Sequence, residues 1–254
     1  MPPRQTGRKY WVPVMGIGIG MLIVVAVSLW VRPTLAATLH ARGMEAARQG
    51  DLDRAVVEFT WAIRLGSDSA MVYLNRCDIY QRRQMPDRAI ADLTQALQRD
   101  PSLAAAYNAR GLAYVTMGDY ASAVADYSQA TRLAPQPSFF ANRAIAYQLV
   151  GDYARAIADY DDLLRMDQTD VTAYLNRGLL YAGTGDYDRA IADYTQAIQL
   201  SPGLSSAYLN RALAYRERGR GSEAIQDLQM YLTLEPNVPN RSQIEQQIRK
   251  LGGP

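Results

Sequence analysis

The feature that most limits what this chain can fold into is a segment of about 34 residues that recurs six times. Each copy contains an alanine within a run such as DRAIADYTQAI. The six alanines are Ala55, Ala89, Ala123, Ala156, Ala190 and Ala224, spaced 34, 34, 33, 34 and 34 residues apart. Units of this length cannot bury their apolar faces alone, so they must stack on their neighbours. The period therefore predicts a solenoid rather than one ordinary globular core.

Other residues recur at fixed distances from the alanine. Twelve residues before it stands a small side chain: Gly43, Cys77, Gly111, Ala144, Gly178 or Ala212. A tyrosine follows three residues later in five units, then Gly-Asp in four, and a proline lies twelve residues after the alanine in four. Small residues let two helices cross closely, aromatic rings fill the gaps around the crossing, and glycine ends the first helix. Each unit is thus predicted to be a pair of helices.

This pattern resembles the tetratricopeptide repeat family, whose helix-turn-helix unit has a 34-residue period. The resemblance implies an all-α, right-handed superhelical solenoid. The six units are then 36–69, 70–103, 104–136, 137–170, 171–204 and 205–238. Residues 239–254 are predicted to hold a capping helix and tail. In the second unit Gln84-Met85-Pro86 replaces Gly-Asp, in the fourth Gln168 replaces proline, and the third is one residue short.

The N-terminus carries an apolar segment that predicts a membrane anchor. Residues 11–31 include no charge, and 21 helical residues span roughly 30 Å, the thickness of a bilayer core. Trp11 and Trp30 stand near its two ends, where aromatic rings prefer the membrane interface. A signal peptide cleaved after Ala36 is the alternative, but its apolar core would normally be shorter.

The charges around this segment predict its orientation. Arg4, Arg8 and Lys9 lie on the basic tail formed by residues 1–10. Positive charge on a short flank favours the cytoplasmic side, which places the repeats on the extracytoplasmic side. Pro33 lies in the short joint before the first unit, and we expect a bend there.

One arginine and one carboxylate recur in every unit, sixteen residues apart. The arginines are Arg42, Arg76, Arg110, Arg143, Arg177 and Arg211, and the carboxylates are Glu58, Asp92, Asp126, Asp159, Asp193 and Asp227. They could form a basic strip for an acidic partner, or each arginine could pair with a carboxylate on the adjacent helix. The equal numbers at fixed spacing favour pairing.

An asparagine precedes this arginine in four units: Asn75, Asn142, Asn176 and Asn210. The family resemblance implies that it faces the concave surface. There the series is similar to the asparagine ladder in the repeat domain of the O-linked N-acetylglucosamine transferase, which holds extended polypeptide. One amide per unit could bind the regularly spaced groups of a peptide main chain. Alternatively, the asparagines cap local backbone or stay solvated.

Apolar residues are expected on the same surface. The peptide-binding residues predicted besides the asparagines are Leu112, Ile145, Leu149, Leu179 and Leu213, with Val115, Leu175 and Leu209 beside them. The expected ligand is an extended or helical protein segment with several apolar side chains. The carboxylate clamp of chaperone cofactors is excluded, because its places hold His40, Met44, Ala105 and Ala109.

Two functions remain open: a membrane-tethered scaffold that binds a protein partner, and a structural subunit of a permanent membrane complex or homo-oligomer. An enzyme is not expected, because one Cys, one His and the absence of a phosphate loop leave no catalytic constellation. Asp161 and Asp162 point in different directions on a helix. No metal or cofactor is predicted, and a net charge of +2 gives no reason to expect nucleic acid.

Overall fold

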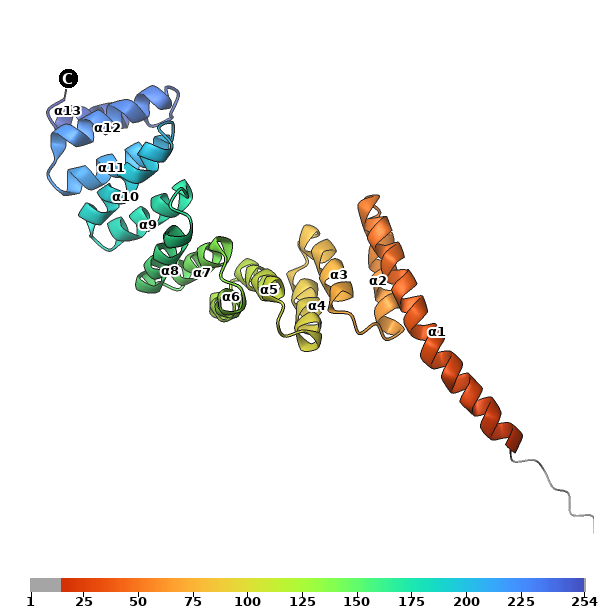
Figure 1. Ribbon diagram of the computed structural model, residues 1–254. Coiled ribbons are helices and arrows are strands. Elements are labelled where there is room, and N and C mark those ends of the chain that lie inside the picture. Colours follow the sequence, from red (N-terminus) through yellow and green to blue (C-terminus); the bar gives the residue numbers. More distant parts are fainter. Residues whose placement is uncertain (1–14, 254) are drawn as a thin grey trace, which may run out of the picture. The chain divides into compact units, whose positions relative to one another are not determined.

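The computed structural model describes the backbone of residues 15–253 and the side chains of residues 31–253, and over this range it is all-α (Figure 1). Its helices are α1 (Met15–Arg48), α2 (Leu52–Arg64), α3 (Ala70–Arg82), α4 (Pro86–Arg99), α5 (Ala104–Thr116), α6 (Tyr120–Leu133), α7 (Pro137–Leu149), α8 (Tyr153–Met166), α9 (Val171–Gly183), α10 (Tyr187–Leu200), α11 (Ser205–Glu217), α12 (Gly221–Leu234) and α13 (Arg241–Lys250). The helices stack in pairs, which confirms the predicted all-α solenoid.

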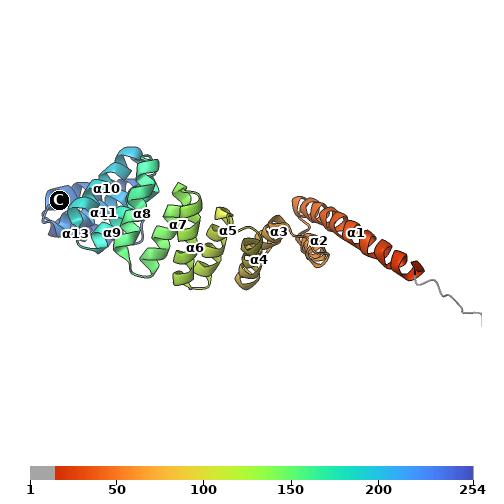
Figure 2. The ribbon, with the colours of Figure 1, turned by 60° about the horizontal axis from the view of Figure 1, so that its bottom comes forward.

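The chain divides into two compact parts, called here the N-terminal unit and the C-terminal unit, which are distinct from the six repeats of the sequence. The N-terminal unit ends at Arg88, in the first turn of α4, and the C-terminal unit begins at Ala89. Within the N-terminal unit, α2 packs against α1 and α3. Within the C-terminal unit, every helix from α5 to α12 packs on the next one, and α13 packs on α12 (Figure 2). Helices α5 and α7 also touch directly, as do α9 and α11.

The recurring small residues lie where two helices of a unit cross. The alanines that mark the repeat, from Ala55 to Ala224, are fully buried. A methyl group added to Gly111 would stand 2.8 Å from Cε1 of Tyr127, and one on Gly178 would stand 2.7 Å from Cε1 of Tyr194. Both rings are buried. The tyrosine ring therefore occupies the space that a side chain in place of the glycine would need, as the sequence pattern predicts.

The Gly-Asp pair joins the two helices of a unit. Gly118 has a φ of 78°, a left-handed conformation that glycine adopts without strain. The carboxylate of Asp119 then accepts a hydrogen bond from the backbone N–H of Ser122 at 3.1 Å, which caps α6. In the second unit Gln84 takes the glycine's place with a φ of 55°, the one positive value for a non-glycine residue in the described chain. The departure seen in the sequence thus keeps the turn geometry.

Helix α1 runs through Pro33 without interruption, from Met15 to Arg48. The helix of the first unit is therefore continuous with the segment before it, where the sequence suggested a joint with a bend. A proline inside a helix lacks the N–H donor and crowds the carbonyl four residues before it, but the hydrogen bonds of the turns on either side can still form.

The predicted membrane segment, residues 11–31, and the basic tail, residues 1–10, fall almost entirely outside the described side chains. In the part of the chain that could be searched, no helix combines the length and the apolar character that a membrane crossing requires.

Helix α13 covers the end of the stack. Its Ile244 and Ile248 are buried against Ala212, Leu228 and Leu232. The last pair of helices is thereby shielded from solvent on its outer side.

Candidate functional site

The recurring arginines are engaged in structural contacts within the C-terminal unit. There the Nε and Nη2 atoms of each arginine donate to both carboxylate oxygens of the aspartate sixteen residues later, at 2.6–2.8 Å. The pairs are Arg110–Asp126, Arg143–Asp159, Arg177–Asp193 and Arg211–Asp227. These hydrogen bonds raise the pKa of each guanidinium above its ordinary value.

The third donor of each arginine links neighbouring units. Nη1 of Arg110 donates to the hydroxyl of Thr94 at 3.1 Å, and Nη1 of Arg211 donates to that of Thr195 at 3.0 Å. Nη1 of Arg177 instead reaches the carboxylate of Asp161 at 2.6 Å. The arginines therefore pair with a carboxylate of the adjacent helix, as the pairing interpretation predicts, and they also bind one unit to the next.

The asparagines of the C-terminal unit have different surroundings. Asn142 donates from its side chain to Oδ1 of Asn108 at 2.9 Å, a bond between α7 and α5. The sequence pattern did not indicate Asn108, because it lies one residue before Ala109, which holds the position of the asparagine series in this repeat. Asn176 lies beside Tyr160, whose hydroxyl is buried and close to the Asn176 amide, although no described residue meets it with normal hydrogen-bond geometry. Burial raises the pKa of Tyr160, and the Asn176 amide opposes this shift. Asn210 is half-buried.

Asn75 belongs to the N-terminal unit and is engaged there. Its amide nitrogen lies 2.8 Å from Nε2 of His40 and 2.9 Å from Sδ of Met44. Burial lowers the pKa of His40, so the neutral ring can accept a hydrogen bond from the amide.

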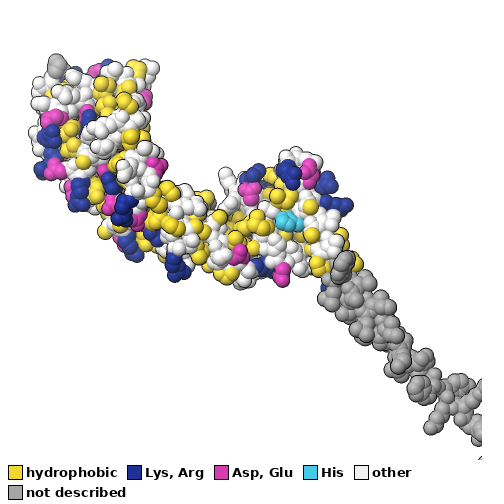
Figure 3. Space-filling model, in the orientation of Figure 1, with side chains coloured by type: hydrophobic (Ala, Val, Ile, Leu, Met, Phe, Trp, Pro, Cys, Tyr) yellow, Lys and Arg dark blue, Asp and Glu magenta, His cyan; other side chains and the backbone are white. Residues whose placement is uncertain are grey.

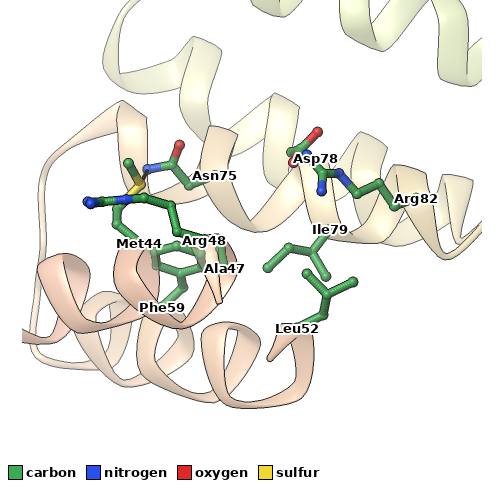
Figure 4. A pocket seen from close by; sticks show the side chains of 9 residues that line it. All are labelled: Met44, Ala47, Arg48, Leu52, Phe59, Asn75, Asp78, Ile79 and Arg82. Carbon is green, nitrogen blue, oxygen red and sulfur yellow. Dashed lines mark hydrogen bonds and ion pairs between the residues drawn. The ribbon is translucent and has the colours of Figure 1, made fainter. Parts of the chain in front are cut away.

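A cavity of about 440 Å³ lies beside Asn75 (Figure 4). Its lining is Met44, Ala47, Arg48, Leu52, Phe59, Asn75, Asp78, Ile79 and Arg82. The two arginines pair with carboxylates on their own helices, Arg48 with Glu45 at 3.2 Å and Arg82 with Asp78 at 2.9 Å. The cavity thus has an apolar floor and a polar rim in which the charges are balanced.

Apolar side chains of α5, α7 and α9 are exposed on the face that carries the asparagines. Leu112 is 52% exposed, Ile145 42%, Leu149 46% and Leu179 41%, while Leu213 on α11 is half-buried. A leucine or isoleucine three residues after an asparagine, and Leu149 seven residues after Asn142, share its side of the helix. We call this surface the first-helix face. Figure 3 shows hydrophobic side chains gathered over α5 and α7.

The first-helix face is uncharged over three units. Its polar groups on α5, α7 and α9 are Asn108, Thr116, Ser138, Asn142, Gln148, Thr172 and Asn176. Charged residues enter only on α11, where Arg216 and Glu217 pair with each other at 2.8 Å. A ligand of this face would meet leucines and amides, without a charge to select for an acidic or basic segment.

A small notch interrupts the first-helix face at Gly183. The cavity has a volume of about 140 Å³ and is lined by Gln148, Tyr153, Leu179, Leu180 and Gly183. A methyl group added to Gly183 would have no other atom within 4 Å. The notch, which could accept one aliphatic side chain, was missed in the sequence. The signal for it in the sequence is that Gly183 stands where α7, the first helix of the preceding repeat, carries Leu149.

Potential metal ligands are dispersed. Over the described residues, no three His, Cys, Asp or Glu side chains are grouped so that they could hold a metal ion. Cys77 is free and buried at its helix crossing.

Comparison with known families gives matches over the repeats. The family described as Tetratricopeptide repeat matches residues 104–137, 142–205 and 184–239, which together make up more than half of the chain. The TPR repeat-containing thioredoxin TDX of Arabidopsis thaliana is 33% identical over 98 residues, 39% of this chain and 26% of that protein. Hsc70-interacting protein 1 of Drosophila melanogaster is likewise 33% identical over 98 residues, with the same coverage. The chain thus spans only about a quarter of these relatives.

Solved structures show the same fold at low sequence identity. YrrB, described as a TPR protein with an unusual peptide-binding site, has a TM-score of 0.65 and 22% identity, over 74% of this chain and 97% of that one. PilW, described as a type IV pilus biogenesis factor, has a TM-score of 0.64 and 17% identity, over 83% of this chain and 98% of that one.

Proposed function

Because the chain belongs to the tetratricopeptide repeat family, whose repeats form protein-interaction domains, we propose that it is a non-enzymatic scaffold whose first-helix face holds a segment of a protein partner. The observation that carries this proposal is the exposure of Leu112, Ile145, Leu149 and Leu179 on three successive first helices. A contiguous apolar surface on a folded protein usually marks an interaction site.

The chemistry of the face selects the partner. A segment in contact with α5, α7 and α9 meets no charged side chain, so it should be uncharged and carry aliphatic residues. The half-buried amides of Asn142, Asn176 and Asn210 can bind its main-chain N–H and C=O groups, in an extended or a helical form. A protein ligand is supported by the similar proteins, one of which is named an Hsc70-interacting protein and one of which is described as having a peptide-binding site.

The Gly183 notch would hold one side chain of the segment. Its volume of about 140 Å³ suits a leucine, isoleucine or methionine. Burial of such a side chain contributes about 1.5–3 kcal/mol, which corresponds to roughly a 10- to 150-fold change in Kd.

The scaffold is proposed to be tethered to a membrane by residues 11–31, with the N-terminus in the cytoplasm and the repeats on the extracytoplasmic side. Support comes from the 21 uncharged residues, the basic tail before them, and the continuity of α1 with the first unit. Carbonate extraction of membranes tests the tether, and protease protection of intact cells tests the orientation. Release by carbonate would refute the tether, and digestion only after the membrane that holds the tether is opened would refute the orientation.

The test of partner binding uses peptides selected from a displayed library on the full chain in detergent. Kd values are then measured by calorimetry for the wild type, Gly183→Leu and the triple variant Asn142/Asn176/Asn210→Ala. Gly183→Leu fills the notch and should weaken binding by at least 10-fold without loss of helicity. Gly203→Leu is the matched control, because it adds the same side chain in open space outside the face.

Two results would count against this function. If Gly183→Leu binds like Gly203→Leu, the notch holds no ligand side chain. If selection returns no peptide and the chain sediments as a fixed oligomer that Leu149→Glu dissolves, the face serves self-association, which is the alternative function.

A further inference from the structure

The outer face of α2 carries side chains that differ from those of the other second helices. Val57 is 54% exposed and Trp61 is 49% exposed. Spaced four residues apart, they share one side of the helix. At the place of Val57 the other units have Ala91, Ala125, Ala158, Ala192 and Gln226, and at the place of Trp61 they have Gln95, Gln129, Asp162, Gln196 and Met230. Only the first unit exposes an aromatic ring here.

Two arginines flank this pair. Arg54 lies three residues before Val57 and Arg64 three residues after Trp61, and both are exposed. The Arg64 guanidinium lies 5.1 Å from the centre of the Trp61 ring, and Arg64 makes no ion pair with any described residue. Arg54 is 3.8 Å from Glu58, whose side chain is only 14% exposed. We call Arg54, Val57, Trp61 and Arg64 the Trp61 patch.

The patch lies toward the end of the N-terminal unit where α1 leads to residues 11–31. A cavity lined by Pro33, Ala36 and Ala37 of α1 and by Gly66 and Ser67 after α2 shows that these segments are neighbours. Trp61 precedes Gly66 by five residues, about 8 Å along a helix. This distance is close to the thickness of the polar layer of one bilayer leaflet.

We propose that the Trp61 patch lies on the membrane surface, with the Trp61 ring and Val57 among the lipid headgroups and Arg54 and Arg64 against their phosphates. The inference rests on the proposed tether, which would bring the first unit to the bilayer. Tryptophan rings prefer this interface, and arginines beside an anionic surface are attracted to it. The composition of the patch, an aromatic and an aliphatic residue between two cations, matches a membrane surface.

The test uses the full chain with Trp11→Phe and Trp30→Phe, which leaves Trp61 as its only tryptophan. The protein is reconstituted into phosphatidylcholine vesicles with or without phosphatidylserine, and Trp61 emission is recorded with ordinary and with brominated lipids. Emission should shift to the blue, and brominated lipid should quench it by at least half, more strongly with phosphatidylserine. Arg54→Gln/Arg64→Gln should at least halve the quenching. Arg155→Gln/Arg132→Gln, at the equivalent places of other units, should leave it unchanged.

Flotation of the vesicles separates failure of the tether from failure of the contact. If the protein does not float with the vesicles, both proposals are overturned. If it floats but Trp61 emits as in water without quenching by lipid, the tether stands and the surface contact is refuted. If Trp61 is shielded from aqueous iodide but not quenched by brominated lipid, a protein covers the patch and the inference is again overturned.

Discussion

Replacement of Arg177 tests whether the recurring arginines hold the array together. Its guanidinium donates to both carboxylate oxygens of Asp193 at 2.8 and 2.6 Å and to Asp161 at 2.6 Å. Asp193 is only 4% exposed. Arg177→Leu would leave this carboxylate buried without its cation, which should lower the free energy of unfolding by about 3–5 kcal/mol. In Arg177→Leu/Asp193→Leu no such buried charge is left, so most of this loss of stability should be recovered.

Urea unfolding at pH 7, followed by circular dichroism, measures both losses. Arg155→Leu is the control, because Arg155 pairs with Asp152 but is 64% exposed, and an exposed pair contributes at most about 1 kcal/mol. Burial already raises the pKa of Asp193, and Arg177 opposes that shift. Without Arg177 the folded pKa rises further above the unfolded value, so the variant should regain stability as the pH falls through it. A loss below about 1 kcal/mol for Arg177→Leu, or one equal to that of the double variant, would refute the structural role.

Further predictions concern the helix crossings and the caps. Gly178→Val places a methyl group against Tyr194, where even Cβ would lie 2.7 Å from the ring, and should cost about 1–3 kcal/mol in urea unfolding. Gly183→Ala meets no neighbour and should leave stability equal or raise it by up to about 1 kcal/mol, so a large loss there would contradict the packing argument. Hydrogen bonds from the first turn of the following helix lower the pKa values of three capping carboxylates: Asp119, Asp152 and Asp186. Their folded pKa values lie below the ordinary 3.8, so their contribution is complete above that pH and is lost as the pH falls below it. Melting temperatures between pH 7 and 2.5 should show this loss, and replacing all three by Asn should flatten the curve; an unchanged curve would exclude the caps as its cause.

The sequence by itself determined the features that every unit repeats. The spacing of Ala55 and its successors specified helix pairs, and the alternation of small residue and ring at Gly178 and Tyr194 specified their crossing. Such contacts recur because each repeat packs against its neighbour in the same way. The same residue types therefore return at the same spacing in all six repeats. The matching of arginines to carboxylates belongs to this class, because it too is repeated at one spacing.

Only the tertiary structure decided what the repeats do not share. It placed Asn142 against Asn108 and Asn75 against His40, so an asparagine series that looks uniform has unlike partners. It also shows a notch at Gly183, a helix α1 that continues through Pro33, and an exposed Trp61 on α2. Each of these depends on side chains from different helices that occur once rather than in a pattern. Their exposure and hydrogen bonds follow from which neighbours the fold brings to them, and a single unit of the repeat does not contain that information.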